Sequence, residues 1–123
     1  MASREEILAY VKRKFQTEPD YPWRQYPEYA VLRHAESGKW YGVIMNLPRA
    51  TLGLAGKGDV EVVNLKCDHV LDVLLNSEPG AVLPAYHMNK EHWNSIVLDG
   101  SVPKEDICRM IDESYALTLP KRR

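Results

Sequence analysis

Residues 84–115, PAYHMNKEHWNSIVLDGSVPKEDICRMIDESY, decide the fold of this chain because they contain a complete strand, turn and helix. β-Branched residues mark a strand over residues 93–98, and Asp99-Gly100 predicts a tight reversal after it. Pro103 suits the first turn of a helix, where a missing N–H group has no intrahelical partner to lose. The helix itself is marked by residues at helical spacing: Ile107, Met110, Ile111, Ser114 and Tyr115.

At the other end of the chain, a first helix is predicted over residues 4–16. Ser3 followed by Glu6 is a capping-box pattern, which is typical of a helix N-terminus. An apolar stripe follows at helical spacing: Ile7, Leu8, Val11 and Phe15. Pro19 and Pro22 end the helix.

A β-hairpin and a third strand are predicted next. Residues 29–35 and 39–47 have the pattern of two strands around a turn at Ser37-Gly38. Strict alternation would put Trp40, Gly42, Ile44 and Asn46 on one face of the second strand, and Tyr41, Val43, Met45 and Leu47 on the other. Both faces are apolar, which predicts a central strand. The glycine-rich residues 48–59 predict a flexible hairpin loop, and a third strand follows at 60–66.

The remaining segments complete one α+β domain over residues 1–123. Asp68 can cap a short helix with apolar positions up to Leu75, and residues 77–85 are a turn-rich connection. The element order is therefore α-β-β-β-α-β-α, with at least one strand between the last two helices. This order predicts an antiparallel sheet with helices packed on it. Residues 118–123 are predicted to be a frayed tail.

The motif H-M-N-K-E-H-W at residues 87–93 resembles the H-[ML]-N-K-x-H-W motif of the small bacterial MmcQ/YjbR family. In that family, as here, a hydrophobic strand, D-G-S-x-P and a helix ending in S-Y follow. The similarity is strongest over residues 83–115 and extends more weakly to Lys39-Trp40-Tyr41. It implies a compact α+β domain, similar in plan to frataxin-like (CyaY) and type III secretion-chaperone-like folds. It also implies DNA binding, in a family whose biological role is uncharacterised.

Composition limits the class of protein. A chain of 123 residues with 45% hydrophobic and 27% charged residues can bury a core as one domain. It has no run of about 18 apolar residues and no signal-peptide pattern, so we expect a cytoplasmic protein without a membrane partner. Cys67 and Cys108 are expected to be free thiols. Because no long apolar seam remains after the core is assigned, we expect a monomer.

The cluster of His87, Asn89, Lys90, His92 and Trp93 is the strongest candidate site. A lysine beside an aromatic ring suits phosphate contact and base stacking, as in proteins that bind single-stranded nucleic acid. The same residues also fit a rigid turn in which the tryptophan enters the core and the histidines satisfy buried carbonyl groups. A role in binding another ligand is a third interpretation.

Basic residues elsewhere are spread along the chain. Arg49 and Lys57 lie in the glycine-rich loop, which could act as a wing that reaches a phosphate backbone. The others are individually typical of a solvated surface: Lys12, Arg13, Lys14, Arg24, Arg33 and Lys66. The formal net charge of −1 argues against strong, indiscriminate nucleic-acid binding, since such binding needs clustered cations.

Metal and catalytic motifs are missing from the sequence. His87 and His92 have no third ligand at a diagnostic spacing, and CxxC and HExxH patterns are absent. Ser101, Ser114 and Cys108 lack a recognisable nucleophile context, and the loop glycines do not form a phosphate-binding fingerprint. We therefore expect a non-enzymatic protein without a cofactor or metal, either one that binds DNA or a protein-interaction module.

Overall fold

The computed structural model describes residues 3–66, 82–84 and 93–119. Within these residues the elements in chain order are α1 (Arg4–Phe15), β1 (Ala30–Arg33), β2 (Trp40–Pro48), the 3₁₀ helix η1 (Arg49–Leu52), β3 (Asp59–Lys66), β4 (Val82–Pro84), β5 (Trp93–Val97) and α3 (Lys104–Leu117). The short helix expected after Asp68 lies outside the described residues.

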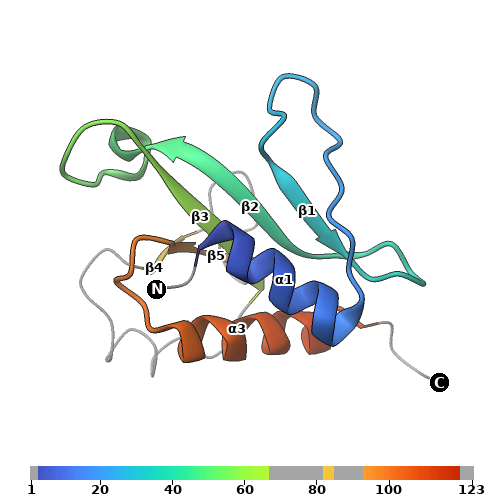
Figure 1. Ribbon diagram of the computed structural model, residues 1–123. Coiled ribbons are helices and arrows are strands. Elements are labelled where there is room, and N and C mark those ends of the chain that lie inside the picture. The colour runs from blue at the N-terminus through green and yellow to red at the C-terminus, as the bar shows by residue number, and fades with distance from the viewer. Residues whose placement is uncertain (1–2, 67–81, 85–92, 120–123) are drawn as a thin grey trace.

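The strands form one antiparallel sheet in the order β1-β2-β3-β5-β4. Both α1 and α3 lie on the same side of this sheet, and the β2–β3 hairpin extends away from them (Figure 1). The predicted α+β architecture is confirmed. One strand was not predicted: β4 falls in the expected turn-rich connection, where three residues pair with β5 at the edge of the sheet.

Helix α1 follows the local rules that the sequence suggests. The Ser3 side chain accepts a hydrogen bond from the Glu6 N–H at 3.3 Å, which satisfies one of the free donors of the first turn. Gln16 ends the helix in a left-handed conformation, with φ of 57°. Ile7 and Val11 are the residues of α1 that become buried.

A β-bulge at Tyr41 changes which residues of β2 face the helices. Leu32 pairs with Gly42, but the next residue, Arg33, pairs with Trp40, so Tyr41 is the extra residue. The strict alternation predicted for this strand is therefore wrong at its start. Tyr41 joins Ile44 in the core under the helices, whereas Trp40 packs on the opposite face.

The two faces of the sheet carry separate apolar cores. The core between the sheet and the helices is the larger one and includes Leu32, Tyr41, Ile44, Val63, Leu65, Ile96, Ile107 and Ile111. The core on the other face contains Val31, Val43, Met45, Leu47, Val60, Val62 and Val97, with Trp23, Tyr29, Trp40, Leu52 and Leu54 packed against it. Burial on both faces confirms the central position predicted for β2.

The outer edge of β1 is partly covered by the chain segment that precedes it. The N–H of Asp20 donates to the carbonyl of Val31 at 3.0 Å, and the N–H of Val31 donates back to Asp20 at 2.8 Å. The segment 21–29 then rises from the body of the molecule beside β1 (Figure 1).

The packed part of the chain extends one residue into the stretch predicted to be a frayed tail. Thr118 falls in the stretch predicted to fray, yet it is buried, and its hydroxyl donates to the Ser114 carbonyl at 2.7 Å. Its oxygen also lies 2.7 Å from Nε2 of the buried His34, so the residue that follows β1 is linked to the end of α3.

Candidate nucleic-acid interface

The structure places only part of the predicted site. His87, Asn89, Lys90 and His92 lie outside the described residues. Trp93 is the first residue of β5 and is half-buried. Its ring makes no contact with another aromatic ring in the described part of the chain.

Arg49 and Lys57 lie at the opposite end of the sheet from Trp93. Pro48 pairs with Asp59 at the hairpin tip, while Lys66 pairs with Trp93 at the far end of β3. The length of β3 separates the two places, about 23 Å at roughly 3.3 Å per residue. The structure therefore does not bring Trp93 together with the cations of the loop.

The two loop cations differ from each other in their surroundings. Lys57 is exposed between two glycines of positive φ, whereas Arg49 is half-buried in η1. Burial opposes ionisation of Asp99, but hydrogen bonds from Ser101 and the nearby charge of Arg49 together lower the pKa of this carboxyl group. Since Arg49 faces a carboxylate, Lys57 is the freer cation of the hairpin tip.

A second set of residues does come together, at the sheet end where Trp93 lies. Arg33 pairs with Trp40 across β1 and β2, and Lys66 pairs with Trp93 across β3 and β5. We call these four residues, Arg33, Trp40, Lys66 and Trp93, the cation–aromatic row. All four are half-buried, and cations and aromatic residues alternate along four neighbouring strands.

Strand alternation puts the row on the face opposite α1 and α3. Val62 and Val97 belong to the core of that face, and counting in twos along each strand leads from Val62 to Lys66 and from Val97 to Trp93. Trp40 packs on the same core. The bulge at Tyr41 is required for this arrangement, since it moves Trp40 to this face.

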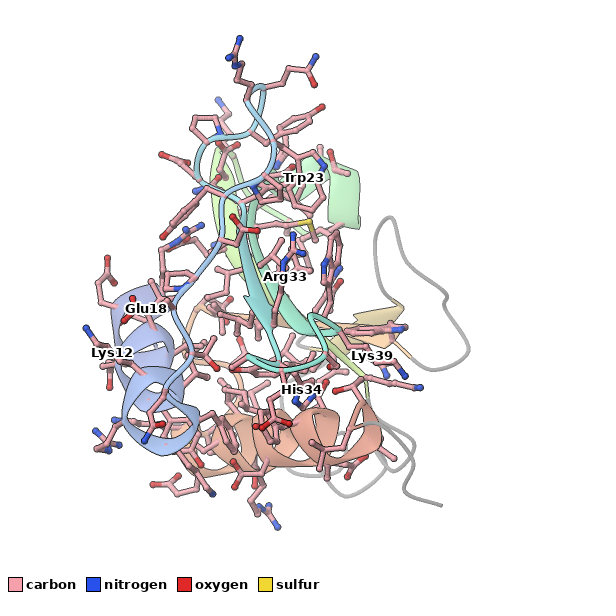
Figure 2. All side chains as sticks on the ribbon, turned by 90° about the vertical axis from the view of Figure 1, so that its right-hand side faces the viewer. Lys12, Glu18, Trp23, Arg33, His34 and Lys39 are labelled. Atoms are coloured by element: carbon pink, nitrogen blue, oxygen red, sulfur yellow. The ribbon has the colours of Figure 1, made fainter. Side chains whose placement is uncertain are left out.

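Arg33 and Trp40 are held in place by their neighbours. The Arg33 guanidinium lies over the Trp40 ring at 5.6 Å and pairs with the Asp20 carboxylate at 2.8 Å. Trp23 contacts Trp40 edge-on, with ring centroids 5.5 Å apart. Figure 2 shows Trp23 above Arg33, and both lie above α3 in that view. This half of the row is thus rigid and partly neutralised.

Lys66, within the row, and Lys39, next to Trp40, are less engaged in ion pairs within the described structure than Arg33 is. The backbone N–H of Lys66 is fixed by a 2.9 Å hydrogen bond to the Ser114 hydroxyl, but its ammonium group forms no ion pair with a described carboxylate. Lys39, next to Trp40, is exposed and likewise has no such ion pair within residues 3–66, 82–84 and 93–119. In Figure 2 Lys39 lies on the side of the molecule away from Lys12 and α1.

The cations of the helices, in contrast, are mostly neutralised. Their ion pairs are Arg4–Glu61, Lys12–Glu18, Lys14–Asp112, Lys104–Glu6 and Arg109–Asp106. The pairing with Lys104 lowers the pKa of Glu6, and Asp112 raises the pKa of Lys14. Among the described residues, the cations without an ion pair to a described carboxylate are Lys39 and Lys66 at the row, Arg49 and Lys57 at the hairpin tip, Arg13 on α1 and Arg24 on the segment 21–29.

One further depression lies beside segment 21–29. It has a volume of about 170 Å³ and is lined by Gln25, Tyr26, Pro27, Glu28, Tyr29, Asn46 and Asp59. Tyr26 stacks on Tyr29 with centroids 4.6 Å apart. The two carboxylates of this depression would repel phosphate, so it does not extend the cationic surface.

The described residues also bear on metal binding, thiol reactivity and membrane spanning. They contain no group of three or more side chains able to hold a metal ion. Burial raises the pKa of the Cys108 thiol, which disfavours the reactive thiolate. No helix in the described part of the chain is both long and apolar enough to cross a membrane.

The sequence-based prediction included Trp93 but did not group it with Arg33, Trp40 and Lys66. Taken singly in the sequence, Arg33 and Lys66 are each typical of an ordinary solvated surface residue. The available signal was the position of all four residues at strand ends, which becomes informative only when the strand order and register are known.

Comparison with known proteins places the chain among uncharacterised relatives. The YjbR family model matches residues 12–117. The uncharacterized protein YyaQ of Bacillus subtilis is 50% identical over 119 residues, which cover 96% of this chain and 99% of that relative. The uncharacterized Escherichia coli protein YjbR is 42% identical over 53 residues, covering 43% of this chain and 45% of that protein.

Solved structures show the same architecture. A crystal structure of a Pseudomonas syringae protein superposes with a TM-score of 0.86 at 38% identity, covering 96% of this chain and all (100%) of that one. A Deinococcus radiodurans protein of the domain family DUF419 has a TM-score of 0.71 at 22% identity, over 98% of this chain and 81% of that one. The latter likeness concerns the fold alone.

Proposed function

The chain belongs to the YjbR family, and we propose that it is a non-enzymatic DNA-binding protein whose contact surface is the cation–aromatic row together with Lys39. The observation that carries the proposal is the alternation of Arg33, Trp40, Lys66 and Trp93 across four strands. Cations beside half-exposed aromatic rings provide phosphate contact and base contact on one surface.

DNA binding is compatible with a net charge of −1 because it depends on where the cations lie and not on the total charge. Electrostatic binding depends on the local density of cations, because each neutralised phosphate releases counterions. The ion pairs of α1 and α3 remove those helices from the contact surface, which leaves Lys39 and Lys66 as the principal phosphate contacts.

Fluorescence anisotropy with labelled DNA at about 50 and 200 mM salt tests the proposal, since phosphate-driven affinity falls steeply over that range. The double variant Lys39→Gln, Lys66→Gln should weaken binding and flatten the salt dependence by roughly one unit of slope per lost phosphate contact. The control Lys12→Gln, Arg13→Gln removes the same charge from α1 and should bind like the wild type. Absence of saturable binding at the lower salt concentration would overturn the proposal.

A protein-interaction module is the second candidate, and the segment 21–29 favours it. Tyr21 and Tyr26 are 47% and 50% exposed, and the depression beside Tyr26 carries the carboxylates of Glu28 and Asp59. Aromatic surface next to acidic groups suits a partner with an exposed basic side chain. Affinity capture from nuclease-treated lysate, with wild type compared with Tyr26→Ala, separates the two candidates. A specific protein captured only by the wild type would favour this candidate.

A further inference from the structure

We infer that the cation–aromatic row binds single-stranded nucleic acid in preference to duplex, with Trp93 stacking on an unpaired base and Lys66 contacting a phosphate beside it. This inference rests on the proposed function and deepens it by naming the form of nucleic acid. Lys39, the residue before Trp40, supplies a further phosphate contact.

The spacing of the two rings favours unpaired bases. Trp40 is on β2 and Trp93 on β5, with β3 between them, so the two strands that carry the rings are two strand spacings or about 10 Å apart. Bases in a duplex follow one another at about 3.4 Å and expose only their edges in the grooves. A ring on a sheet surface can therefore stack only on a base that has left the duplex.

Of the two rings of the row, Trp93 has fewer contacts with the other described residues. Trp40 is already in contact with the Arg33 guanidinium and with Trp23, whereas Trp93 has no ring or cation over it among the described residues. Lys66 is its direct cross-strand partner, and side chains in such a pair lie about 5 Å apart at the Cβ atoms. The base contact and the phosphate contact are thus adjacent.

The surface beneath Trp93 and Lys66 is rigid. Two positions along the ladder from their pair, the buried Ser95 hydroxyl donates to the Asn64 side-chain carbonyl at 2.5 Å. The Lys66 backbone is fixed to α3 through Ser114. Because these groups are already ordered, binding immobilises fewer protein groups, which favours affinity.

Duplex recognition has less support in the described structure. A helix or a two-stranded ribbon must enter the major groove to read bases, yet the cations of α1 and α3 other than Arg13 are engaged in ion pairs. The hairpin tip offers Lys57 as its free cation, about 23 Å from the row. On α1, Arg13 and Lys14 lie over the Tyr10 ring at 5.8 and 5.6 Å, but Asp112 binds both the Tyr10 hydroxyl and the Lys14 ammonium group.

Anisotropy with three labelled ligands of equal length tests the inference: oligo(dT), oligo(U) and a mixed-sequence duplex DNA at the same salt concentration. We expect at least one single strand to bind at least about tenfold more tightly than the duplex. Trp93→Leu should weaken single-strand binding by roughly 5- to 150-fold, which corresponds to one stacked base. Trp93→Phe keeps an aromatic ring and should retain most of the affinity, and Tyr26→Leu removes an exposed ring outside the row as the matched control.

The outcomes separate this inference from the proposed function. Equal or tighter duplex binding overturns the single-strand preference and leaves DNA binding intact. Tight binding of oligo(U) without oligo(dT) or duplex supports the single-strand preference and overturns DNA as the ligand. Failure of all three ligands to bind overturns both. Unchanged single-strand affinity in a folded Trp93→Leu protein, checked by circular dichroism, removes Trp93 from the contact surface and overturns the inference.

Discussion

The hydroxyl of Ser114 on α3 donates to the backbone carbonyl of Tyr41 at 2.5 Å, one residue beyond the last pair of the β2–β3 ladder, Gly42 and Leu65. The same hydroxyl accepts the N–H of Lys66 at 2.9 Å. A helix side chain thus joins β2 and β3 just beyond the end of their ladder, and it fixes the start of the surface on which Trp40 and Lys66 lie.

Replacement of Ser114 by alanine should destabilise the protein by about 1–3 kcal/mol, because the Tyr41 carbonyl and the Lys66 N–H would lose their partner in a buried place. Urea unfolding monitored by circular dichroism measures this change. Ser37→Ala, in an exposed turn, is the control and should change stability by less than about 0.5 kcal/mol. A loss for Ser114→Ala no larger than that of the control would show that the bridge is unimportant.

Gly42 should not tolerate alanine, although its backbone conformation is ordinary. An added Cβ would lie 3.0 Å from Cδ1 of Leu32 and 3.3 Å from Cδ2 of Leu65. Overpacking of this kind costs about 1–3 kcal/mol. In a double-mutant cycle, Leu32→Val removes the closest atom, so Gly42→Ala should cost less in that background. Equal costs in both backgrounds would place the strain elsewhere.

The protein should become less stable as the pH falls below neutrality, because the folded state favours the neutral form of His34. Burial lowers the pKa of this histidine, and the nearby charge of Lys39 lowers it further, although a hydrogen bond to the Tyr115 backbone opposes the shift. Since the folded state favours the neutral ring, its contribution is complete above the unfolded pKa of about 6.5 and is lost as the pH falls below it. Unfolding free energies between about pH 7.5 and 5.5 should therefore decrease in the wild type.

His34→Gln is the matched variant for that measurement. Tyr41 and Tyr115 surround the ring and Thr118 contacts Nε2, so glutamine keeps a polar group there without a charge that titrates near neutrality. The variant should be less stable at pH 7.5 but should show a shallower decline toward pH 5.5. A decline as steep as in the wild type would assign the pH dependence to other groups.

Charge removal at the two ends of the sheet should have unequal effects on DNA affinity. Lys39→Gln removes a cation next to Trp40, and Lys57→Gln removes one at the hairpin tip, about 23 Å away. We expect several-fold weaker binding for the first variant and less than about twofold for the second, measured by anisotropy at low salt. The reverse order would show that the hairpin loop, acting as a wing, makes the main phosphate contact.

The fold was largely predictable because local patterns and packing agree in most elements. The capping box at Ser3, the strand before Asp99-Gly100 and the apolar stripe of α3 each act within a few residues. The bulge at Tyr41 was not predictable, since both faces of β2 are apolar and a change of face leaves no trace in the pattern. Strand β4 was missed because it has only three residues.

The candidate site was less accessible to sequence reasoning than the fold. Trp93 and Lys57 were grouped by residue type, but strand direction separates them. Arg33 and Lys66 are 33 positions apart in the chain and meet on one surface only through the order β1-β2-β3-β5. Long-range register of this kind is set by tertiary packing, which single-residue patterns do not report.

The bridge between Asp20 and Val31 also determines how this protein can meet copies of itself. An exposed edge strand offers free backbone groups that template association with another chain, and many proteins block such edges with a charged residue or a covering segment. At β1, Asp20 protects the edge in both ways. Its backbone forms hydrogen bonds with the backbone of Val31, and its carboxylate forms an ion pair with Arg33. Extension of the sheet into a fibril is therefore opposed at this edge, and Asp20→Pro, which removes the backbone donor, would reopen it.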